Sequence, residues 1–162
     1  MAKGKAVFLD RDGVINHDPG DYTMHVSDFQ ILPTVLSTLK YWNELGYKLI
    51  LITNQGGIAK GLYGHTEVDD IHAYFLKACD KAGVEIVDIF YSPHHDDYGK
   101  SMTRKPGSLM IERAVHRHNI DPSQSFMIGD KQRDLDAGDQ VGLTGILIVP
   151  NSPLSEIKEF LA

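Results

Sequence analysis

The stretch FLDRDGVIN, residues 8–16, joins an apolar run to two closely spaced carboxylates. Residues 6–9 are all apolar, and near-continuous apolar runs are typical of strands buried on both faces in a parallel sheet. Asp10 and Asp12 follow this run two positions apart, so their side chains are expected to point to the same side of an extended chain. Gly13 allows the chain to turn sharply directly after them.

Four further apolar runs resemble the first and predict the other strands, at 48–52, 86–91, 125–128 and 146–149. Apolar residues at helical spacing fill the intervals and predict helices from Pro33 to Gly46, from a cap at Thr66 to Gly83, over 108–119, over 133–141, and from Ser152-Pro153 onward. Strands that alternate with helices favour an α/β domain with a doubly wound, Rossmann-like parallel sheet.

The composition predicts one domain, residues 1–162, with a full core, since 42% of the residues are hydrophobic and 23% charged. The formal net charge of −6 argues against a nucleic-acid partner. Cys79 is the single cysteine, which excludes an internal disulfide and suits a reducing compartment. No apolar stretch approaches the roughly 20 residues of a membrane span. We therefore expect a cytoplasmic monomer with no membrane partner.

Polar residues cluster where the predicted strands end: Asp10 after the first, Thr53-Asn54 after the second, Arg104-Lys105 after the third and Gly129-Asp130 after the fourth. The carboxyl ends of parallel strands meet at one edge of the sheet, and ligands bind there at the point where strand order reverses. With the strand order 3-2-1-4-5, the loops that carry Asp10 and Asp130 flank that crevice.

Asp10, Asp12 and Asp130 would form a carboxylate cluster, which needs a cation because like charges repel. Oxygen ligands in a small open set suit Mg²⁺. Thr53 and Lys105 add a hydroxyl and an ammonium, both good partners for phosphate. A carboxylate about 4 Å from a phosphate charge is repelled by roughly 4 kcal/mol at an effective dielectric of about 20, which Mg²⁺ and Lys105 must reverse. The set fits phosphoryl transfer, with a carboxylate attacking phosphorus and Asp12 as acid and base.

Four segments resemble, in order, the four motifs of the haloacid dehalogenase (HAD) superfamily in its DxD phosphatase form: FLDRDGVIN (8–16), LITNQGGIAKG (51–61), RKP (104–106) and MIGDKQRDLDAG (127–138). The resemblance covers about residues 5–150 and implies a three-layer fold without a cap domain, for which segment 92–104 is too short. Within the superfamily the sequence is similar to the heptose 1,7-bisphosphate and histidinol-phosphate phosphatase families. The resemblance implies a Mg²⁺-dependent enzyme that removes the 7-phosphate of the heptose during lipopolysaccharide or nucleotide-heptose precursor synthesis.

The resemblance also implies roles for single residues. Asp10 would be the nucleophile and Asp12 the general acid and base, with Thr53 and Lys105 on the transferred phosphoryl group. Mg²⁺ would be held by the Asp10 side chain, the Asp12 backbone carbonyl and Asp130, with a supporting role for Asp134. The positions that match substrate contacts of the family are Asp18, Pro19, Gly20, Asn54, Gln55, Arg104 and Lys131.

One departure from the family concerns a zinc loop, commonly Cys-x-His and Cys-x-Cys before the Arg-Lys-Pro motif. The matching positions here are Ser92, His94, Ser101 and Thr103. Three thiolates are thus replaced by hydroxyls, and we expect no structural Zn²⁺ of the usual N/S kind. Hydrogen bonds among Ser92, His94 and Asp96 are the expected replacement.

Alternative functions stay open on the sequence. Histidinol phosphate is a second possible substrate, because Asp18, Asp21 and Asp97 are suited to its amine. A phospho-accepting signalling receiver has similar residue types, but the order of the candidate acceptor, the Thr and the Lys differs. A nucleic-acid 3′-phosphatase shares the motifs, but the negative charge and the lack of a basic stripe oppose it.

Overall fold

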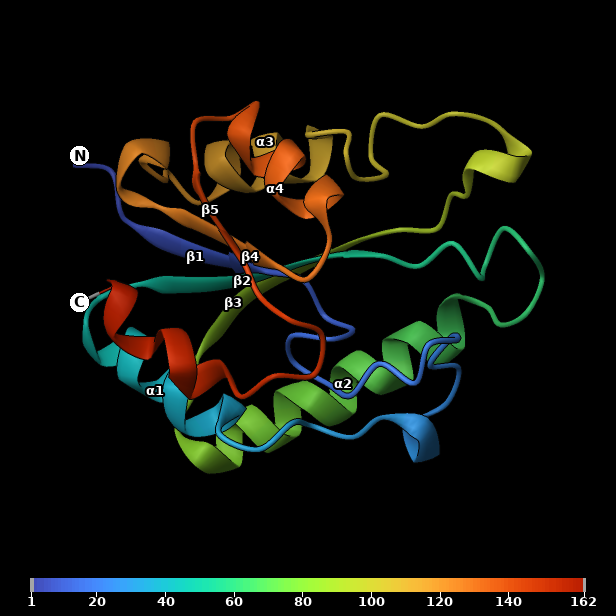
Figure 1. Cartoon of the computed structure of the whole chain (residues 1–162), viewed down its shortest axis with the longest axis horizontal. Helices are drawn as coiled ribbons and strands as arrows, with labels where there is room; N and C mark the ends of the chain where they lie inside the picture. Colours follow the sequence, from blue (N-terminus) through green and yellow to red (C-terminus); the bar gives the residue numbers. More distant parts are fainter. Residues whose placement is uncertain (1, 162) are drawn as a thin grey trace.

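The computed structural model describes residues 2–161 and contains one five-stranded parallel sheet with the strand order β3-β2-β1-β4-β5 (Figure 1). The strands are β1 (Ala6–Leu9), β2 (Lys48–Asn54), β3 (Ile86–Ser92), β4 (Phe126–Gly129) and β5 (Thr144–Leu147). This arrangement confirms the predicted fold class and strand order. In the described residues, the segments between strands hold helices and loops and no cap domain.

Helices cover both faces of the sheet (Figure 1). The helices are α1 (Val35–Glu44), α2 (His65–Ala82), α3 (Leu109–Arg117) and α4 (Gln132–Asp139), with 3-10 helices at Val26–Asp28, Asp96–Tyr98, Pro122–Gln124 and Leu154–Leu161. Strand β1 alternates between two cores, since Val7 and Leu9 pack with α1, α2 and the last 3-10 helix, while Ala6 and Phe8 pack with α3 and α4. The three predicted layers follow from this alternation.

Most element boundaries differ from the sequence-based expectation by one or two residues, and two of these differences have a clear cause. Helix α2 begins at His65, so Thr66 lies inside its first turn, and the Glu67 carboxylate instead accepts a hydrogen bond from the Gly64 N–H at 2.8 Å. Strand β5 begins two residues before the predicted 146, because the edge strand pairs with β4 from Thr144 onward. The apolar pattern at this exposed edge is a weak guide to where pairing starts.

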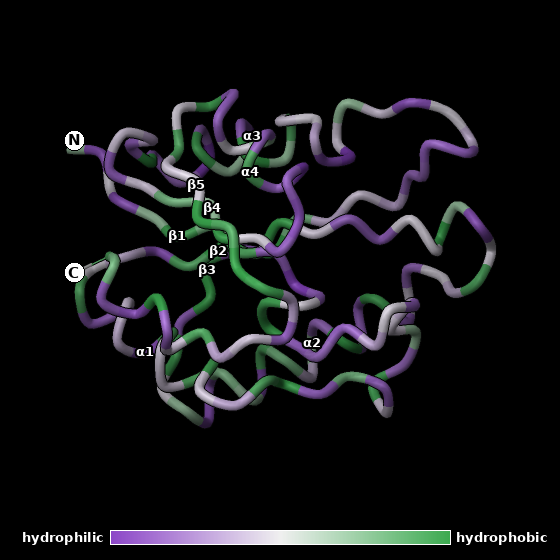
Figure 2. The backbone as a smooth tube through the Cα atoms, viewed as in Figure 1, coloured by the Kyte–Doolittle hydropathy of each residue, from purple (hydrophilic) through white to green (hydrophobic). Residues whose placement is uncertain are grey.

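The loops that follow β1, β2 and β3 all extend from one edge of the sheet, opposite the side on which both chain ends lie (Figure 1). Figure 2 shows hydrophobic residues along much of the sheet and a mixture of hydrophilic and hydrophobic residues in these loops. Within residues 2–161, no helix is long and apolar enough to cross a membrane.

Candidate active site

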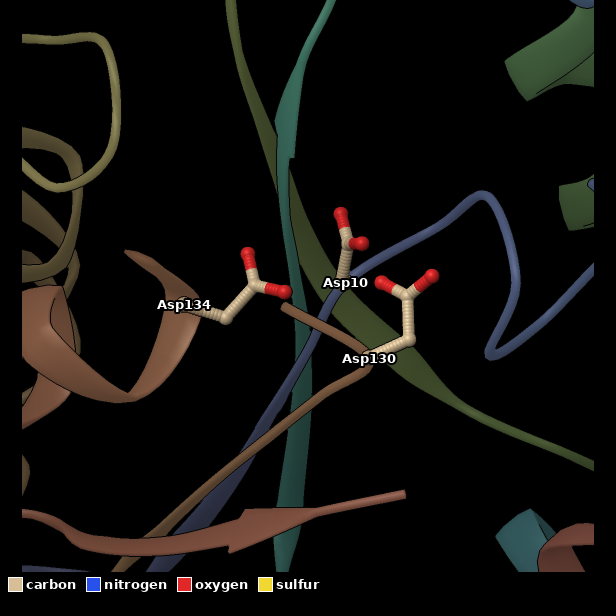
Figure 3. Close-up of side chains that lie close together, drawn as sticks. All are labelled: Asp10, Asp130 and Asp134. Atoms are coloured by element: carbon tan, nitrogen blue, oxygen red, sulfur yellow. The ribbon is translucent and has the colours of Figure 1, made fainter. Parts of the chain in front are cut away.

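A buried carboxylate cluster lies at the carboxyl edge of the two central strands. Asp10 directly follows β1, Asp130 directly follows β4, and Asp134 lies in the first turn of α4. Oxygen atoms of these three carboxylates lie within 4.8 Å of one another (Figure 3). The loop after β1 can pass close to the Asp130 carboxylate because residue 13 is glycine. A Cβ at this position would overlap that carboxylate, and the Gly13 φ of +88° suits glycine.

Lys105 places one ammonium group inside this cluster. Its Nζ lies 2.9 Å from Asp10 Oδ1 and 2.6 Å from Asp134 Oδ1, and it donates a hydrogen bond to the Ile52 carbonyl at 2.6 Å. The Asn54 amide fixes the Lys105 backbone, since Oδ1 accepts from its N–H at 2.9 Å and Nδ2 donates to its carbonyl at 3.1 Å. The Lys105 side chain is 1% exposed, so its charge acts where solvent screening is weak.

The cluster keeps an excess of negative charge in the absence of a further cation. Burial raises the pKa of Asp10 well above its usual value; Lys105 opposes the rise, and the neighbouring carboxylates add to it. Burial also raises the pKa of Asp130. Burial would lower the pKa of Lys105, but the charges of Asp10 and Asp134 outweigh it and the pKa is raised. Three carboxylates thus share one ammonium group.

Asp130 is the clearest mark of a cation site. Both of its carboxylate oxygens are buried without a hydrogen-bond partner among the described residues, and the Lys131 ammonium is 3.9 Å from Oδ2. A buried carboxylate without partners is costly, and a bound metal ion removes that cost. Hard oxygen donors from Asp10 and Asp130 fit Mg²⁺, which usually keeps several waters beside one or two carboxylates.

The Asp12 carboxylate lies outside this cluster. Its Oδ1 accepts hydrogen bonds from Arg11 Nε and Nη2 at 3.1 and 3.0 Å and from Asn16 Nδ2 at 2.9 Å, and its Oδ2 accepts from Gln55 Nε2 at 3.2 Å. The Asp12 side chain was expected to join Asp10 and Asp130, but it is not among the carboxylates that lie within 4.8 Å of one another. Asp134 takes that place in the cluster. Metal binding through the Asp12 backbone carbonyl stays a prediction.

A pocket nevertheless joins Asp10 and Asp12. It is lined by Asp10, Asp12, Asp18, Asp21, Tyr22, Asn54, Gln55, Lys105, Asp130, Lys131 and Arg133. Most of these residues were candidates on the sequence, but Tyr22 and Arg133 were not. The signal for Arg133 was its place three residues after Asp130, on the first turn of the helix that the Asp130 loop begins.

Four candidate residues are not among those that line this pocket. Pro19 lines an adjoining hollow with Asp21 and Tyr22, and Gly20 belongs to the same loop. The Arg104 side chain donates to the His94 carbonyl at 3.0 Å and lies 3.7 Å from Asp96. Thr53 is 1% exposed. Their predicted contacts with substrate stay predictions.

Hydroxyl groups link the two ends of loop 92–104. Thr103 Oγ1 lies 2.9 Å from Ser92 Oγ and 2.8 Å from Ser101 Oγ, both within hydrogen-bond distance. These three residues occupy the positions where the family commonly has cysteines. The expected set of Ser92, His94 and Asp96 is wrong in its partners, because Ser92 bonds to Thr103 whereas the other two contact Arg104.

The comparisons with known proteins agree with this geometry. Residues 102–151 match the family model for HAD-hydrolase-like proteins. The chain is 37% identical to the D-glycero-alpha-D-manno-heptose-1,7-bisphosphate 7-phosphatase of Photorhabdus laumondii over 97% of this chain and 89% of that protein. It is 38% identical to the D-glycero-beta-D-manno-heptose-1,7-bisphosphate 7-phosphatase of Vibrio cholerae over 100% of this chain and 90% of that protein.

A solved structure gives the same result. The crystal structure of D,D-heptose 1,7-bisphosphate phosphatase from B. bronchiseptica, complexed with magnesium and phosphate, superposes with a TM-score of 0.85 at 30% identity, covering 94% of this chain and 84% of that one. The likeness extends over nearly the whole chain, and the buried Asp cluster fits the magnesium of that relative. The chain is thus a HAD-type phosphatase, a phosphoric monoester hydrolase, and it belongs to the D-glycero-D-manno-heptose-1,7-bisphosphate 7-phosphatase family.

Proposed function

We propose that this enzyme removes the 7-phosphate of a D-glycero-D-manno-heptose 1,7-bisphosphate. The observation that carries the proposal is the contact of the Asp10 carboxylate with the Lys105 ammonium at 2.9 Å, in a pocket that Asp12 also lines. The proposed nucleophile Asp10, the proton donor Asp12 and the phosphate-binding Lys105 thus line the same pocket. The substrate itself is inferred from the relatives, whose printed names give that activity.

Asp10 and Asp12 would divide the chemistry between them. An Asp10 carboxylate oxygen attacks phosphorus, so that an O–P bond forms while the bond to the leaving sugar oxygen breaks. Asp12 gives its proton to that leaving oxygen. Asp12 then takes a proton from water, whose oxygen attacks the aspartyl phosphate and releases inorganic phosphate with Asp10 restored.

Charge neutralisation would come from two sources. Mg²⁺, when bound by the Asp10 side chain, Asp130 and the Asp12 backbone carbonyl, supplies positive charge beside the transferred phosphoryl group. Lys105 supplies a second positive charge, and its pairing with Asp134 holds the ammonium in place. The Thr53 hydroxyl adds a hydrogen-bond donor for a phosphoryl oxygen.

The rest of the pocket would bind the sugar. Lys131 and Arg133 place positive charge at its rim, which suits a substrate with two phosphates. Asn54 and Asp18 line the same pocket, and Pro19 lines the adjoining hollow. We further propose that residues 1–162 act as one phosphatase domain in a cytoplasmic monomer. The single cysteine and the negative net charge are compatible with that location.

Histidinol phosphate is the second candidate, because Asp18 and Asp21 both line the pocket and would attract an amine. Turnover of the two substrates by the same preparation, beside a panel of sugar phosphates, separates the candidates. We expect the highest kcat/KM with the heptose bisphosphate. Faster hydrolysis of histidinol phosphate than of any sugar phosphate would overturn the proposed substrate.

A further inference from the structure

We propose that Tyr63 is a positioning residue of this phosphatase, acting through Gln55 on both Asp12 and Thr53. The inference rests on the proposed roles of Asp12 and Thr53 and goes beyond them, because Tyr63 does not line the pocket that holds Asp10. Tyr63 lies just before α2, at the end of the loop that follows β2.

The Gln55 side chain connects three groups and is itself 2% exposed. Its Nε2 donates hydrogen bonds to Thr53 Oγ1 at 2.9 Å and to Asp12 Oδ2 at 3.2 Å, which uses both amide hydrogens. Its Oε1 accepts from the Tyr63 hydroxyl at 2.8 Å. With these bonds made, the Gln55 side chain has little capacity left for substrate, so we assign it to holding its neighbours.

Tyr63 determines which way the Gln55 amide faces. A primary amide can turn by half a rotation and exchange its oxygen and nitrogen. The turned amide would place Oε1 against the Asp12 carboxylate and withdraw the N–H groups from Thr53. The Tyr63 hydroxyl opposes that turn because it donates to Oε1, and it does so whether or not Asp12 carries a proton.

Tyr63 is held firmly enough to do this. It is 8% exposed, its ring lies against Gly57, where a Cβ would overlap the ring, and the Tyr22 ring centroid is 6.1 Å away. Burial, with a smaller contribution from the Asp12 charge, raises the pKa of Tyr63 to about 12. The phenol therefore keeps its proton at neutral pH and can serve as a donor.

The hydrogen bonds of Gln55 orient both Thr53 and Asp12. Because Thr53 Oγ1 accepts from Gln55, the Thr53 proton is directed away from the amide, toward the Asn54 carbonyl at 3.4 Å, a long contact that a phosphoryl oxygen would replace. Because Gln55 supports Asp12 Oδ2 while Arg11 and Asn16 support Oδ1, the Asp12 carboxylate has one orientation at the pocket. Loss of the Tyr63 hydroxyl should therefore slow the chemical step more than it weakens substrate binding.

The variant Tyr63→Phe removes only the hydroxyl. With an aryl phosphate ester as substrate, we expect kcat to fall by about tenfold, the effect of one hydrogen bond of ordinary strength on a rate, with KM little changed. Tyr41→Phe is the matched control, because the Tyr41 hydroxyl bonds to Glu159 and Tyr41 does not line the pocket, and it should match the wild type. Unchanged kcat in Tyr63→Phe, or a change confined to KM, would overturn the proposal.

A double-mutant cycle tests the route through Gln55. In a Gln55→Leu background, Tyr63→Phe should cause no further loss of kcat, whereas a full tenfold loss there would mean that Tyr63 acts by another route. An inactive wild-type enzyme would refute the proposed function rather than this network. In that case the urea midpoints of the wild type, the two single variants and the double variant test the network. A double-variant shift that differs from the sum of the single shifts supports the Tyr63–Gln55 contact, and a shift equal to that sum rejects it.

Discussion

The free energy of unfolding should depend on pH through one buried histidine, His72. This residue of α2 is 7% exposed, and its Nε2 lies 3.3 Å from Arg11 Nη1. A guanidinium only donates hydrogen bonds, so Nε2 must be the acceptor and the imidazole must be neutral. Burial, followed by the Arg11 charge, lowers the pKa of His72 from 6.5 to about 3.

The sign and size of the effect follow from the two states. Above pH 6.5 His72 is neutral in the folded and the unfolded chain and makes no pH-dependent contribution. Below that pH the unfolded chain binds a proton that the folded chain does not, so the free energy of unfolding falls until about pH 3. At about 1.36 kcal/mol per pH unit, the loss on going from pH 6.5 to pH 5.0 is about 2 kcal/mol.

Urea unfolding of the wild type and of His72→Gln, each at about pH 7.5 and pH 5.0, measures this quantity. The Gln amide oxygen still accepts from Arg11 and does not titrate in this range. Other groups contribute equally to both proteins, so the wild type should lose about 2 kcal/mol more than the variant. Equal losses in the two proteins would refute the assignment of a neutral, buried His72.

Three further outcomes follow from the carboxylate cluster. Asp10→Asn, an isosteric change, should abolish turnover with an unchanged circular dichroism spectrum, and substantial phosphate release by the purified variant would contradict Asp10 as the nucleophile. Lys105→Met leaves Asp10 and Asp134 buried without their cation and should lower the free energy of unfolding by about 3–5 kcal/mol, and an unchanged urea midpoint would count against the buried pair. A chelator should stop turnover and added Mg²⁺ should restore it, whereas activity that persists in the chelator would argue against a metal requirement.

Much of the fold could be predicted because its signals are local. The central strands β1 and β2 are largely apolar runs, and the polar residues at strand ends, such as Asp10 and Asp130, mark the edge where parallel strands finish. The strand order then brings these two carboxylates together, and Lys105 joins them from the loop after β3. Residues that lie far apart in the sequence could therefore be assigned to one site.

The finer geometry depends on contacts that no local pattern reveals. Spacing alone placed Asp12 beside Asp10, but the buried Arg11 guanidinium and the Gln55 amide draw its carboxylate away. Tyr63 gave no signal, since a tyrosine before a helix is ordinary and its partner is eight residues earlier. The hydroxyls of loop 92–104 likewise pair across the loop, which depends on how that loop folds back.

The two aspartates of FLDRDGVIN are therefore alike in sequence and opposite in environment. Asp10 faces one ammonium and two more carboxylates, where burial raises its pKa and a metal ion would return it to the ionised form a nucleophile needs. Asp12 is 28% exposed, accepts hydrogen bonds from Arg11, Asn16 and Gln55, and lines the pocket where the leaving oxygen would lie. Arg11, the residue between them, pairs with the Asp12 carboxylate at 3.0 Å, whereas Lys105 pairs with the Asp10 carboxylate at 2.9 Å.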